Sequence, residues 1–364
     1  MSAQADDRRR KLAAIREAAM ADRATPLIRN AWYVAAKGDE ISRELLGRTI
    51  LDRSVVLYRL EDGTPVALQN RCCHRSFPLS EGRLEGDTLV CRYHGLRYGR
   101  DGRCIEVPSQ PGPPANIGVR SYPVREKGPF VWIWTGNPRL LDEDALPHQD
   151  WLESPDWDRY IGYLYINANY VHMHENLLDL SHLSFLHETT FGTPEYARAP
   201  IELTVEEPNF EVWRRVECKL PAIYAKPLGW EGEKALRSSG AQFVSPGLHV
   251  NTGILKNLER PDANPDALPT IKVAQLITPA GQNSLHYYYC GSRNFARNNP
   301  DTTEFMQNAQ FAAFSEDLYA LENIRDMQDA DHDPDFYEID VGADQAGVAM
   351  RRYLKKLADA EAGA

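Results

Sequence analysis

The feature that most constrains this chain is a pair of short patterns, each of which joins one cysteine to one histidine. Cys72 precedes His74 with one residue between them, and Cys91 precedes His94 with two. The stretch between the pairs, residues 75–90, is 16 residues long. Thiolates and imidazoles hold zinc and iron–sulfur centres in proteins. The two pairs therefore predict a metal centre.

A structural zinc site is one interpretation of these pairs, because two thiolates and two imidazoles suit tetrahedral zinc. Zinc fingers usually pair cysteine with cysteine and histidine with histidine, however. Mixed pairs suit a [2Fe–2S] cluster in which one iron takes both cysteines and the other takes both histidines. The spacing favours the cluster. Cys73 lacks the one-residue gap to His74, and we expect Cys104 to pack rather than ligate.

A second group of candidate ligands lies in the leucine-rich stretch from Asn176 to His187. On a helix, Asp179 and His182 share a face because they are three residues apart, and Asn176 lies on that side too. His187 follows His182 by five positions, so it converges only if the helix widens or ends there. Two histidines and one carboxylate form the facial ligand set of non-haem Fe(II) oxygenases. Simple packing of the two histidines is the alternative.

The third ligand of that set is a carboxylate, for which Asp179 is one candidate. The other is Asp317, which shares an apolar face with Phe314 and Leu321 at helical spacing. Glu316, one position earlier, is expected to point roughly away. Because a carboxylate on a buried face must be paired or bound to metal, we predict Asp317 as the ligand.

The remaining pattern predicts a charged helical arm over residues 1–25, a small antiparallel β domain over 26–140 and a larger domain over 141–364. A chain of 364 residues is too long for one ordinary core. Strand candidates are Thr49–Leu51, Val55–Arg59, Pro65–Gln69, Phe130–Trp134, Arg159–Tyr170, 201–218, 241–255 and 270–290. Two helical patterns cover 301–329 and 343–360.

The composition limits the kinds of partner that this protein can bind. The net charge of −11 argues against nucleic acid, which needs a cationic surface. Residues 71–103 nevertheless contain seven arginines against four acidic residues, which indicates either a solvated surface or a dock for an acidic partner. No apolar run is long enough to cross a bilayer, and the charged N-terminus has no signal-peptide centre. We therefore expect a cytoplasmic protein.

The ligand patterns resemble those of a known family. Cys72, His74, Cys91 and His94 match the Rieske pattern position for position, and the stretch 176–187 resembles the N/E-x-x-D-x-x-H-x-x-x-x-H motif of Rieske non-haem iron oxygenases. The resemblance implies an α+β fold: a Rieske β-sandwich domain, then a catalytic domain with an antiparallel sheet flanked by helices, of the helix-grip type. It also implies a [2Fe–2S] cluster, a mononuclear Fe(II) and O2 as co-substrate.

In this family the mononuclear iron is bound by residues that correspond to His182, His187 and Asp317. The resemblance places Asn176 near the iron. It makes Asp179 a bridge rather than a ligand, one that connects His182 to His94 of a neighbouring subunit in a homotrimer. Such a carboxylate would orient imidazole tautomers and shorten the electron path.

Several segments look like the branch that includes vanillate O-demethylase and dicamba monooxygenase. They are Asn30-Ala-Trp-Tyr-Val-Ala-Ala, Leu46-Gly-Arg-Thr-Ile, His94-Gly-Leu, Asn176-Leu-Leu-Asp-Leu-Ser-His and Ser292-Arg-Asn-Phe. Members typically hydroxylate a methyl carbon on oxygen or nitrogen of an aromatic substrate, so O-demethylation or N-dealkylation is expected. Ring hydroxylation, as in aromatic dioxygenases, and electron carriage without oxygenase activity are the alternatives.

Electrons must come from a separate reductase or ferredoxin, because the chain has no nucleotide-binding glycine fingerprint and can use NAD(P)H only indirectly. Counting from the motifs, His249, Gln275 and Asn308 fall where related demethylases place substrate-facing groups. Their polarity suggests a substrate with a carboxylate, phenol or amide. His172 and His174 lie outside the motif and are expected to pack or to support the ligands.

Overall fold

The computed structural model describes residues 18–113, 115–333 and 336–363. The chain divides into two compact units, of which the smaller consists of Ile28–His148 with Thr278–Gly281. The larger unit contains the rest of the described chain. Most of the predicted arm over residues 1–25 lies outside the described residues, although Met20 and Ala21 are buried.

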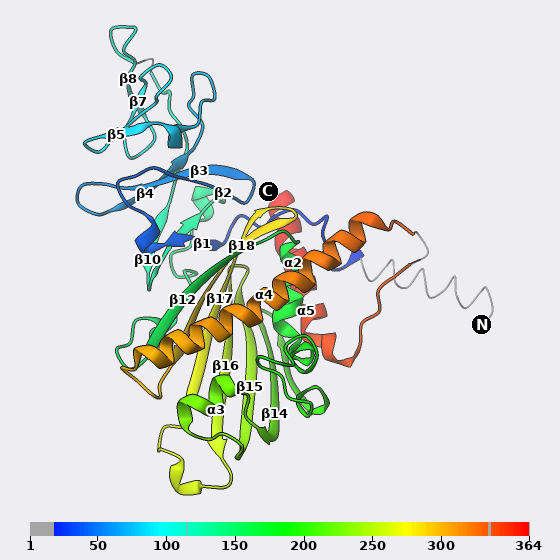
Figure 1. The fold of residues 1–364 in the computed structure, drawn as a ribbon. Coiled ribbons are helices and arrows are strands. Elements are labelled where there is room, and N and C mark those ends of the chain that lie inside the picture. The colour runs from blue at the N-terminus through cyan, green and yellow to red at the C-terminus, as the bar shows by residue number, and fades with distance from the viewer. Residues whose placement is uncertain (1–17, 114, 334–335, 364) are drawn as a thin grey trace, which may run out of the picture. The chain divides into compact units, whose positions relative to one another are not determined.

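The smaller unit is built from three antiparallel sheets, with strand orders β1-β11-β10, β2-β3-β4-β9 and β5-β6-β7-β8 (Figure 1). Its strands are β1 (Trp32–Lys37), β2 (Leu46–Ile50), β3 (Arg53–Arg59), β4 (Pro65–Gln69), β5 (Arg83–Glu85), β6 (Thr88–Val90), β7 (Arg97–Tyr98), β8 (Cys104–Glu106), β9 (Ser121–Tyr122), β10 (Val124–Lys127) and β11 (Phe130–Trp134). Every residue of β11 is buried, because this strand is central in its sheet. The antiparallel β fold that was predicted for this part of the chain is thus confirmed.

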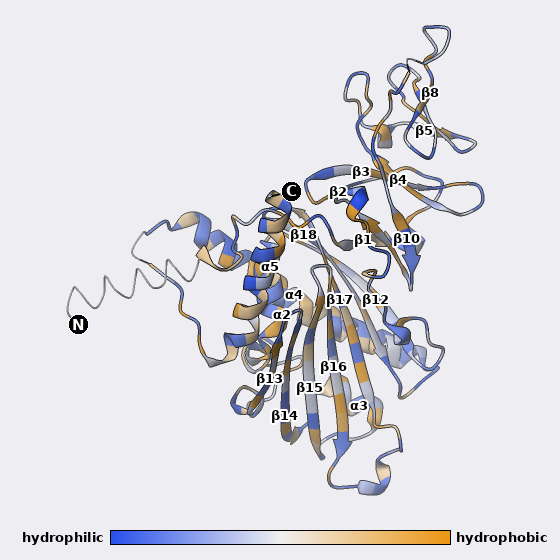
Figure 2. Cartoon of the chain, turned by 180° about the vertical axis from the view of Figure 1, so that it is seen from behind, coloured by the Kyte–Doolittle hydropathy of each residue, from blue (hydrophilic) through white to orange (hydrophobic). Residues whose placement is uncertain are grey.

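The larger unit contains one seven-stranded sheet in the order β12-β18-β17-β16-β15-β14-β13. Its strands are β12 (Asp158–Ile166), β13 (Ile201–Glu206), β14 (Asn209–Lys219), β15 (Lys234–Ser245), β16 (Leu248–Asn257), β17 (Thr270–Gly281) and β18 (Ser284–Arg293). Along β14, buried and more exposed residues alternate, as in a strand with one face toward the core. In Figure 2 the strands of this sheet carry both hydrophilic and hydrophobic segments.

Three predicted strand ranges in this unit each contain a turn. Residues 201–218 and 270–290 form the hairpins β13–β14 and β17–β18, and the range 241–255 spans the turn between β15 and β16. Two residues join the strands in each case, which is the commonest hairpin connection. The predicted strand Arg159–Tyr170 ends earlier than expected, at Ile166. The Asn169 side chain accepts a hydrogen bond from Val171 N (2.9 Å) and so caps a helix there.

Among the described residues, four helices complete the larger unit: α2 (Tyr170–Leu178), α3 (Ala222–Leu228), α4 (Pro300–Ala330) and α5 (Gln345–Ala362). The two long helices were predicted from their periodicity and are confirmed. Helix α4 runs across the sheet (Figure 1), and its buried residues recur every three or four positions. They are Met306, Gln310, Ala313, Phe314, Asp317 and Leu321. In the described part of the chain, no helix is long and apolar enough to cross a bilayer.

Candidate metal centre and pocket

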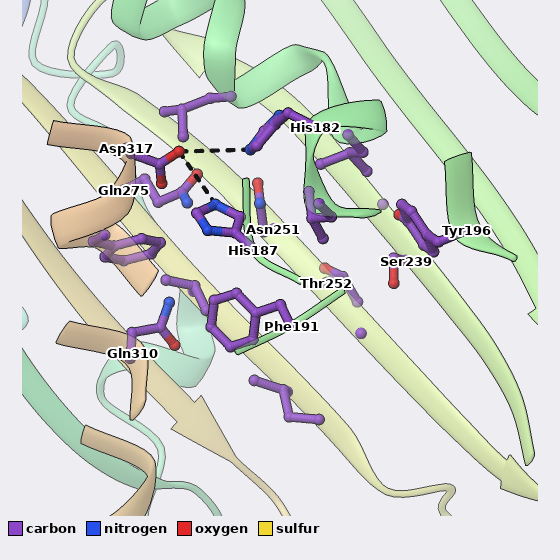
Figure 3. Close-up of a pocket in the computed structure, with 18 of the residues that line it drawn as sticks. His182, His187, Phe191, Tyr196, Ser239, Asn251, Thr252, Gln275, Gln310 and Asp317 are labelled. Atoms are coloured by element: carbon purple, nitrogen blue, oxygen red, sulfur yellow. Dashed lines mark ion pairs between the residues drawn. The ribbon is translucent and has the colours of Figure 1, made fainter. Parts of the chain in front are cut away.

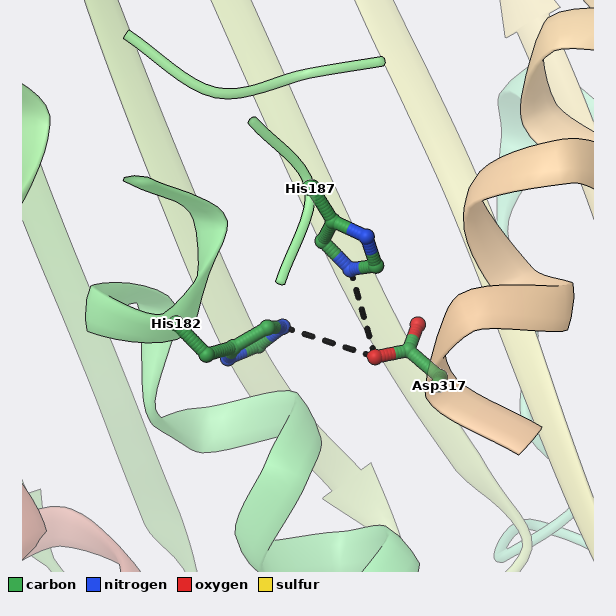
Figure 4. A group of neighbouring side chains, drawn as sticks. All are labelled: His182, His187 and Asp317. Atoms are coloured by element: carbon green, nitrogen blue, oxygen red, sulfur yellow. Dashed lines mark ion pairs between the residues drawn. The ribbon is translucent and has the colours of Figure 1, made fainter. Parts of the chain in front are cut away.

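Two histidines and one aspartate meet in the larger unit. Helix α2 ends at Leu178, a short 3₁₀ helix over Leu180–Ser184 carries His182, and His187 follows in a turn. The α-helix therefore ends before Asp179, and the 3₁₀ helix ends at Ser184, so His187 lies in a turn rather than on a continued helix. Asp317 approaches them from α4 (Figure 4).

The donor atoms of these three residues lie within 4.8 Å of one another. Asp317 Oδ1 is 3.2 Å from His187 Nε2 and 3.6 Å from His182 Nε2. His187 and Asp317 are each 2% exposed, so the carboxylate has no access to bulk water. A buried carboxylate that faces two imidazole nitrogens is the donor set that a non-haem Fe(II) site requires.

Each histidine is oriented by an oxygen on its other ring nitrogen. His182 Nδ1 donates to the backbone carbonyl of Asp179 (2.5 Å), and His187 Nδ1 donates to Glu316 Oε2 (2.6 Å). Because Nδ1 carries the proton in both rings, both Nε2 atoms keep a lone pair for a metal. The expectation that Glu316 points away is wrong. Its longer side chain reaches around the helix to His187 and also accepts a hydrogen bond from Thr190 Oγ1 (2.9 Å).

The two histidines differ in their electrostatic surroundings. Burial lowers the pKa of His182 against the opposing pull of Asp317. Burial also acts to lower the pKa of His187, but Asp317 and Glu316 outweigh it and raise that pKa. The difference follows first from the hydrogen bond of His187 with Asp317 and then from Glu316, a second carboxylate that only His187 contacts.

Two further motif residues hold this arrangement. Asn176 Nδ2 donates to Asp317 Oδ1 (3.0 Å), which places Asn176 at the candidate metal site. The Asp179 carboxylate accepts from Ser181 N (2.7 Å) and Ser181 Oγ (2.9 Å), so it caps the 3₁₀ helix. The expected contact between Asp179 and His182 is therefore made by the Asp179 backbone carbonyl rather than by its side chain.

The cysteine and histidine pairs of the smaller unit lie on two loops with the same hydrogen-bond pattern. Cys72 N donates to Phe77 O (2.9 Å), and Cys91 N donates to Leu96 O (2.9 Å). Gly95, with φ +73°, occupies the left-handed conformation that closes the second loop.

Cys72 and Cys91 are buried, and the pKa of the Cys91 thiol is raised by burial and by its hydrogen bond with Cys72. The rings of His74 and His94 are exposed, with centroids 4.5 Å apart. The loops thus place the thiols inside and the imidazoles outside, which fits a cluster with two chemically different irons. Tyr98 Oη lies 3.1 Å from Cys72 Sγ and 3.2 Å from Cys73 Sγ.

The metal-type triad, formed by His182, His187 and Asp317, opens into a cavity of about 80 Å³ (Figure 3). Its walls are mostly apolar or aromatic: Leu177, Leu180, Leu183, Phe191, Tyr196, Tyr224, Ile271, Val273 and Phe314. Polar residues also reach it, namely Asn176, Arg237, Ser239, Asn251, Thr252, Gln275 and Gln310. The volume is well below the roughly 300–1,000 Å³ of sites for drug-sized ligands, which favours a small substrate.

Of the three residues expected to face the substrate, the structure places only Gln275 on this cavity. Its Oε1 has no hydrogen-bond partner among the described residues. His249 is fully buried elsewhere, with its Nε2 2.7 Å from Nδ1 of His174. Asn308 lies on the exposed face of α4, whereas Gln310, two positions later, lines the cavity. Helical periodicity around Asp317 would have identified Gln310, seven residues before it.

Comparisons with known proteins agree with this geometry. Residues 31–123 match the Rieske [2Fe–2S] domain family, and residues 166–360 match the family described as the vanillate O-demethylase oxygenase C-terminal domain. The iron–sulfur subunit of a toluene-4-sulfonate monooxygenase system from Comamonas testosteroni is 35% identical, over 92% of this chain and 98% of its own. The dicamba O-demethylase oxygenase component from Stenotrophomonas maltophilia is 31% identical, over 92% of this chain and 99% of its own.

A solved structure agrees as well. Dicamba monooxygenase bound to 3,6-dichlorosalicylic acid superposes with a TM-score of 0.88 and 31% identity, over 94% of this chain and all of that chain. A family match to more than half of the chain and relatives of this identity over nearly their whole length are sufficient to assign the family. The chain belongs to the Rieske non-haem iron oxygenases, as an oxygenase component of the branch that includes vanillate O-demethylase and dicamba monooxygenase.

Proposed function

We propose that this oxygenase component hydroxylates a methyl or alkyl carbon on oxygen or nitrogen of a small aromatic substrate, which results in O-demethylation or N-dealkylation. One observation carries the proposal: the buried triad of His182, His187 and Asp317 opens into a small, aromatic-lined cavity. Three relatives support the same reaction class. Two are oxygenase components of O-demethylases, for dicamba and for vanillate, and the third is that of a chloroacetanilide N-alkylformylase.

In demethylation, one O2, two electrons and two protons convert a methoxyarene into a phenol, formaldehyde and water. When bound, Fe(II) at the triad supplies the site at which O2 is activated, and the [2Fe–2S] cluster supplies an electron. Asn176 holds the Asp317 carboxylate in place, and Glu316 and the Asp179 carbonyl hold the imidazoles. The aromatic walls exclude water and place the methyl carbon near the triad.

Polar groups on the cavity wall support specific contacts with the substrate. Gln275 Oε1 and Asn251 Oδ1 have no hydrogen-bond partners among the described residues. Buried acceptors of this kind are costly unless a ligand satisfies them. A donor on the substrate, such as a phenol hydroxyl beside the methoxy group, would pair with them.

The test supplies a reductase and screens methoxylated and N-alkylated aromatics for formaldehyde. His182→Ala should abolish formaldehyde release and lower the iron content from about three to about two per chain, with the visible absorption of the cluster retained. His172→Ala is the matched control, since His172 lies on α2 but outside the triad. It should keep the full iron content.

Three other outcomes would favour other functions. Oxygen added to the ring without formaldehyde would indicate ring hydroxylation. Two irons per chain in the unaltered protein, with no oxygenase activity, would indicate an electron carrier. A colourless protein would indicate zinc.

The proposal includes assembly into a homotrimer in which Asp179 approaches His94 of a neighbouring copy. Asp179 and His182 are only partly buried, and both line a surface groove of about 850 Å³. Two large apolar side chains that line it are exposed, Phe336 (73%) and Ile339 (74%). Exposed apolar area of this kind marks sites of protein association. A monomer by light scattering at micromolar concentration would refute the trimer.

The electron donor is proposed to dock on the arginine-rich surface of the smaller unit. Arg75 and Arg92 are exposed; Arg75 directly follows His74, and Arg92 lies two residues before His94. Exchanging both for glutamate should slow reductase-driven turnover and weaken its dependence on salt. The control is the same exchange at Arg125, which lies on β10 and pairs with Glu143. Unchanged salt dependence in the double variant would rule out this dock.

A further inference from the structure

One buried cation on the cavity wall has no acidic partner among the residues that the structure describes. Arg237, on β15, is 2% exposed and lines the same cavity as the triad. No carboxylate of the described residues forms an ion pair with it. A buried charge without a counterion is costly, so an anionic ligand would stabilise this residue.

The contacts of Arg237 hold its guanidinium in place and leave part of it free. Nε donates to Ser239 Oγ (3.1 Å), and Nη1 donates to the carbonyl of Phe191 (2.6 Å). The guanidinium carbon lies 4.8 Å from the ring centre of Tyr196 and 5.2 Å from that of Tyr224. The rings stabilise the cation but accept no strong hydrogen bond. Nη2 makes no hydrogen bond to any residue that the structure describes.

A second buried arginine shows what a structural role looks like in this sheet. Arg214, on the neighbouring strand β14, is also 2% exposed and lies near Tyr196. Its Nη1 donates to the carbonyls of Tyr196 (3.4 Å), Ala197 (3.1 Å) and Ala199 (2.9 Å). Arg214 thus ties one loop to the sheet and does not line the cavity. Arg237 makes one carbonyl contact and faces the cavity instead.

The position of Arg237 separates it from the metal-type triad. In Figure 3, Tyr196 and Ser239, which Arg237 contacts, lie at one end of the cavity, whereas Asp317 and His182 lie at the other. Asp317 is engaged by the two histidines and by Asn176, so it does not neutralise Arg237. Phe191 and Thr252, which also line the cavity, lie between these ends in the figure.

We propose that Arg237 determines specificity by binding an anionic substituent, a carboxylate or a sulfonate, of the aromatic substrate. The free N–H groups of a guanidinium match two oxygens of such an anion. Because Arg237 and the triad lie at opposite ends of the cavity, the anion occupies the side of the ring opposite the group that is oxidised. This inference rests on the proposed function and narrows its substrate class to aromatic acids.

The first test measures binding without turnover. Benzoate and benzenesulfonate are titrated calorimetrically into the holoprotein, with neutral benzamide and benzenesulfonamide as matched probes. The unaltered protein should prefer the anions. Arg237→Gln should weaken anion binding by roughly 30-fold or more and leave neutral binding nearly unchanged. Arg237→Lys should recover part of the anion preference, since it keeps the charge and loses the planar fork.

Arg214→Lys is the control for general damage around Tyr196, and it should affect anionic and neutral probes equally. An unaltered protein without anion preference, or an Arg237→Gln variant that keeps it, would overturn the proposal. If Arg237→Gln fails to fold, as judged by cluster absorption, Arg237→Lys tests the proposal instead. Its preference for the anions should then be weaker than that of the unaltered protein. A preference for benzoate over benzenesulfonate, or the reverse, identifies which anion the site fits.

The second test measures turnover and separates this inference from the proposed function. Formaldehyde release from 4-methoxybenzoate should exceed that from 2-methoxybenzoate and from 4-methoxybenzamide, chiefly through KM. Equal release from the amide and the acid would contradict the role of Arg237 while the demethylase function stands. Anion binding that depends on Arg237, without formaldehyde from any methoxyarene, would contradict the demethylase function and leave the anion site in place.

Discussion

At the scale of single residues, the two histidines among the candidate iron ligands are held by different oxygens. His182 is held by a backbone carbonyl, which substitution cannot remove, but His187 is held by the Glu316 carboxylate. We expect Glu316→Gln to weaken Fe(II) affinity by roughly 10- to 100-fold, because an oriented and more basic imidazole binds metal more tightly. Fe(II) titration of protein depleted of mononuclear iron measures this.

The control for that variant is Glu322→Gln on the same helix. Glu322 accepts hydrogen bonds from Asn167 and contacts neither histidine. Its exchange should leave the Fe(II) dissociation constant unchanged. Equal affinities for the Glu316 and Glu322 variants would show that His187 needs no support from Glu316.

Tyr98 acts at the other metal centre. Its hydroxyl lies close enough to Cys72 Sγ to donate a hydrogen bond (3.1 Å), and such bonds stabilise the reduced, more negative cluster. Tyr98→Phe should lower the reduction potential by about 20–65 mV, which corresponds to one hydrogen bond of roughly 0.5–1.5 kcal/mol. A redox titration followed by visible absorption measures the shift. Tyr122→Phe, a buried tyrosine distant in sequence from the cluster loops, should keep the original potential.

At the scale of elements, the end of α2 separates the part of the site that could be predicted from the sequence from the part that could not. The order and spacing of ligand types predicted the triad, and the helical pattern around Phe314 predicted that Asp317 is buried. The exit of the chain from α2 at Leu178 depends on tertiary packing rather than on a glycine or proline, so spacing left it open.

Tertiary contacts also account for the residues that sequence reasoning missed. The residues around Arg237 in the sequence do not indicate a cavity. Only the folded structure, with its neighbouring strands and loops, shows that Arg237 has no acidic partner among the described residues. His249 was counted into the cavity from the motifs. The sheet instead turns it toward His174, where two neutral rings pair away from water.

The contact between α2 and α5 gives a prediction about pH. Glu175 on α2 pairs with Arg351 on α5 (2.9 Å), yet burial raises its pKa to about 7 against the opposing effect of Arg351. Since the folded pKa lies above the ordinary value, the folded state binds the extra proton. The stabilising contribution is therefore complete below about pH 4 and is lost as pH rises through about 7.

Glu175→Gln removes this titration. The Tm of this variant minus that of the unaltered protein should rise between pH 5 and 8, by an amount that corresponds to about 1–2 kcal/mol. The effect is no larger because the Glu175 side chain is partly exposed and solvent screens its charge. Thermal unfolding followed by circular dichroism over this pH range measures the difference. Glu231→Gln, at an exposed position, should show a constant difference. A constant difference in Glu175→Gln would mean that Glu175 is ionised throughout.

At the scale of the whole molecule, the proposed trimer makes electron transfer a property of the assembly. Cys72→Ser should remove the cluster, and His182→Ala should remove the mononuclear iron, so each variant alone should be inactive. Any trimer that contains both kinds of chain has one position where an intact cluster faces an intact iron site across an interface. If electrons cross from one chain to the next, trimers isolated by a different tag on each variant should recover about a third of full activity. Trimers made from two differently tagged Cys72→Ser chains are the control and should stay inactive. Mixed trimers without activity would show that each cluster serves the iron of its own chain, and Asp179 would then lose its proposed role as a bridge.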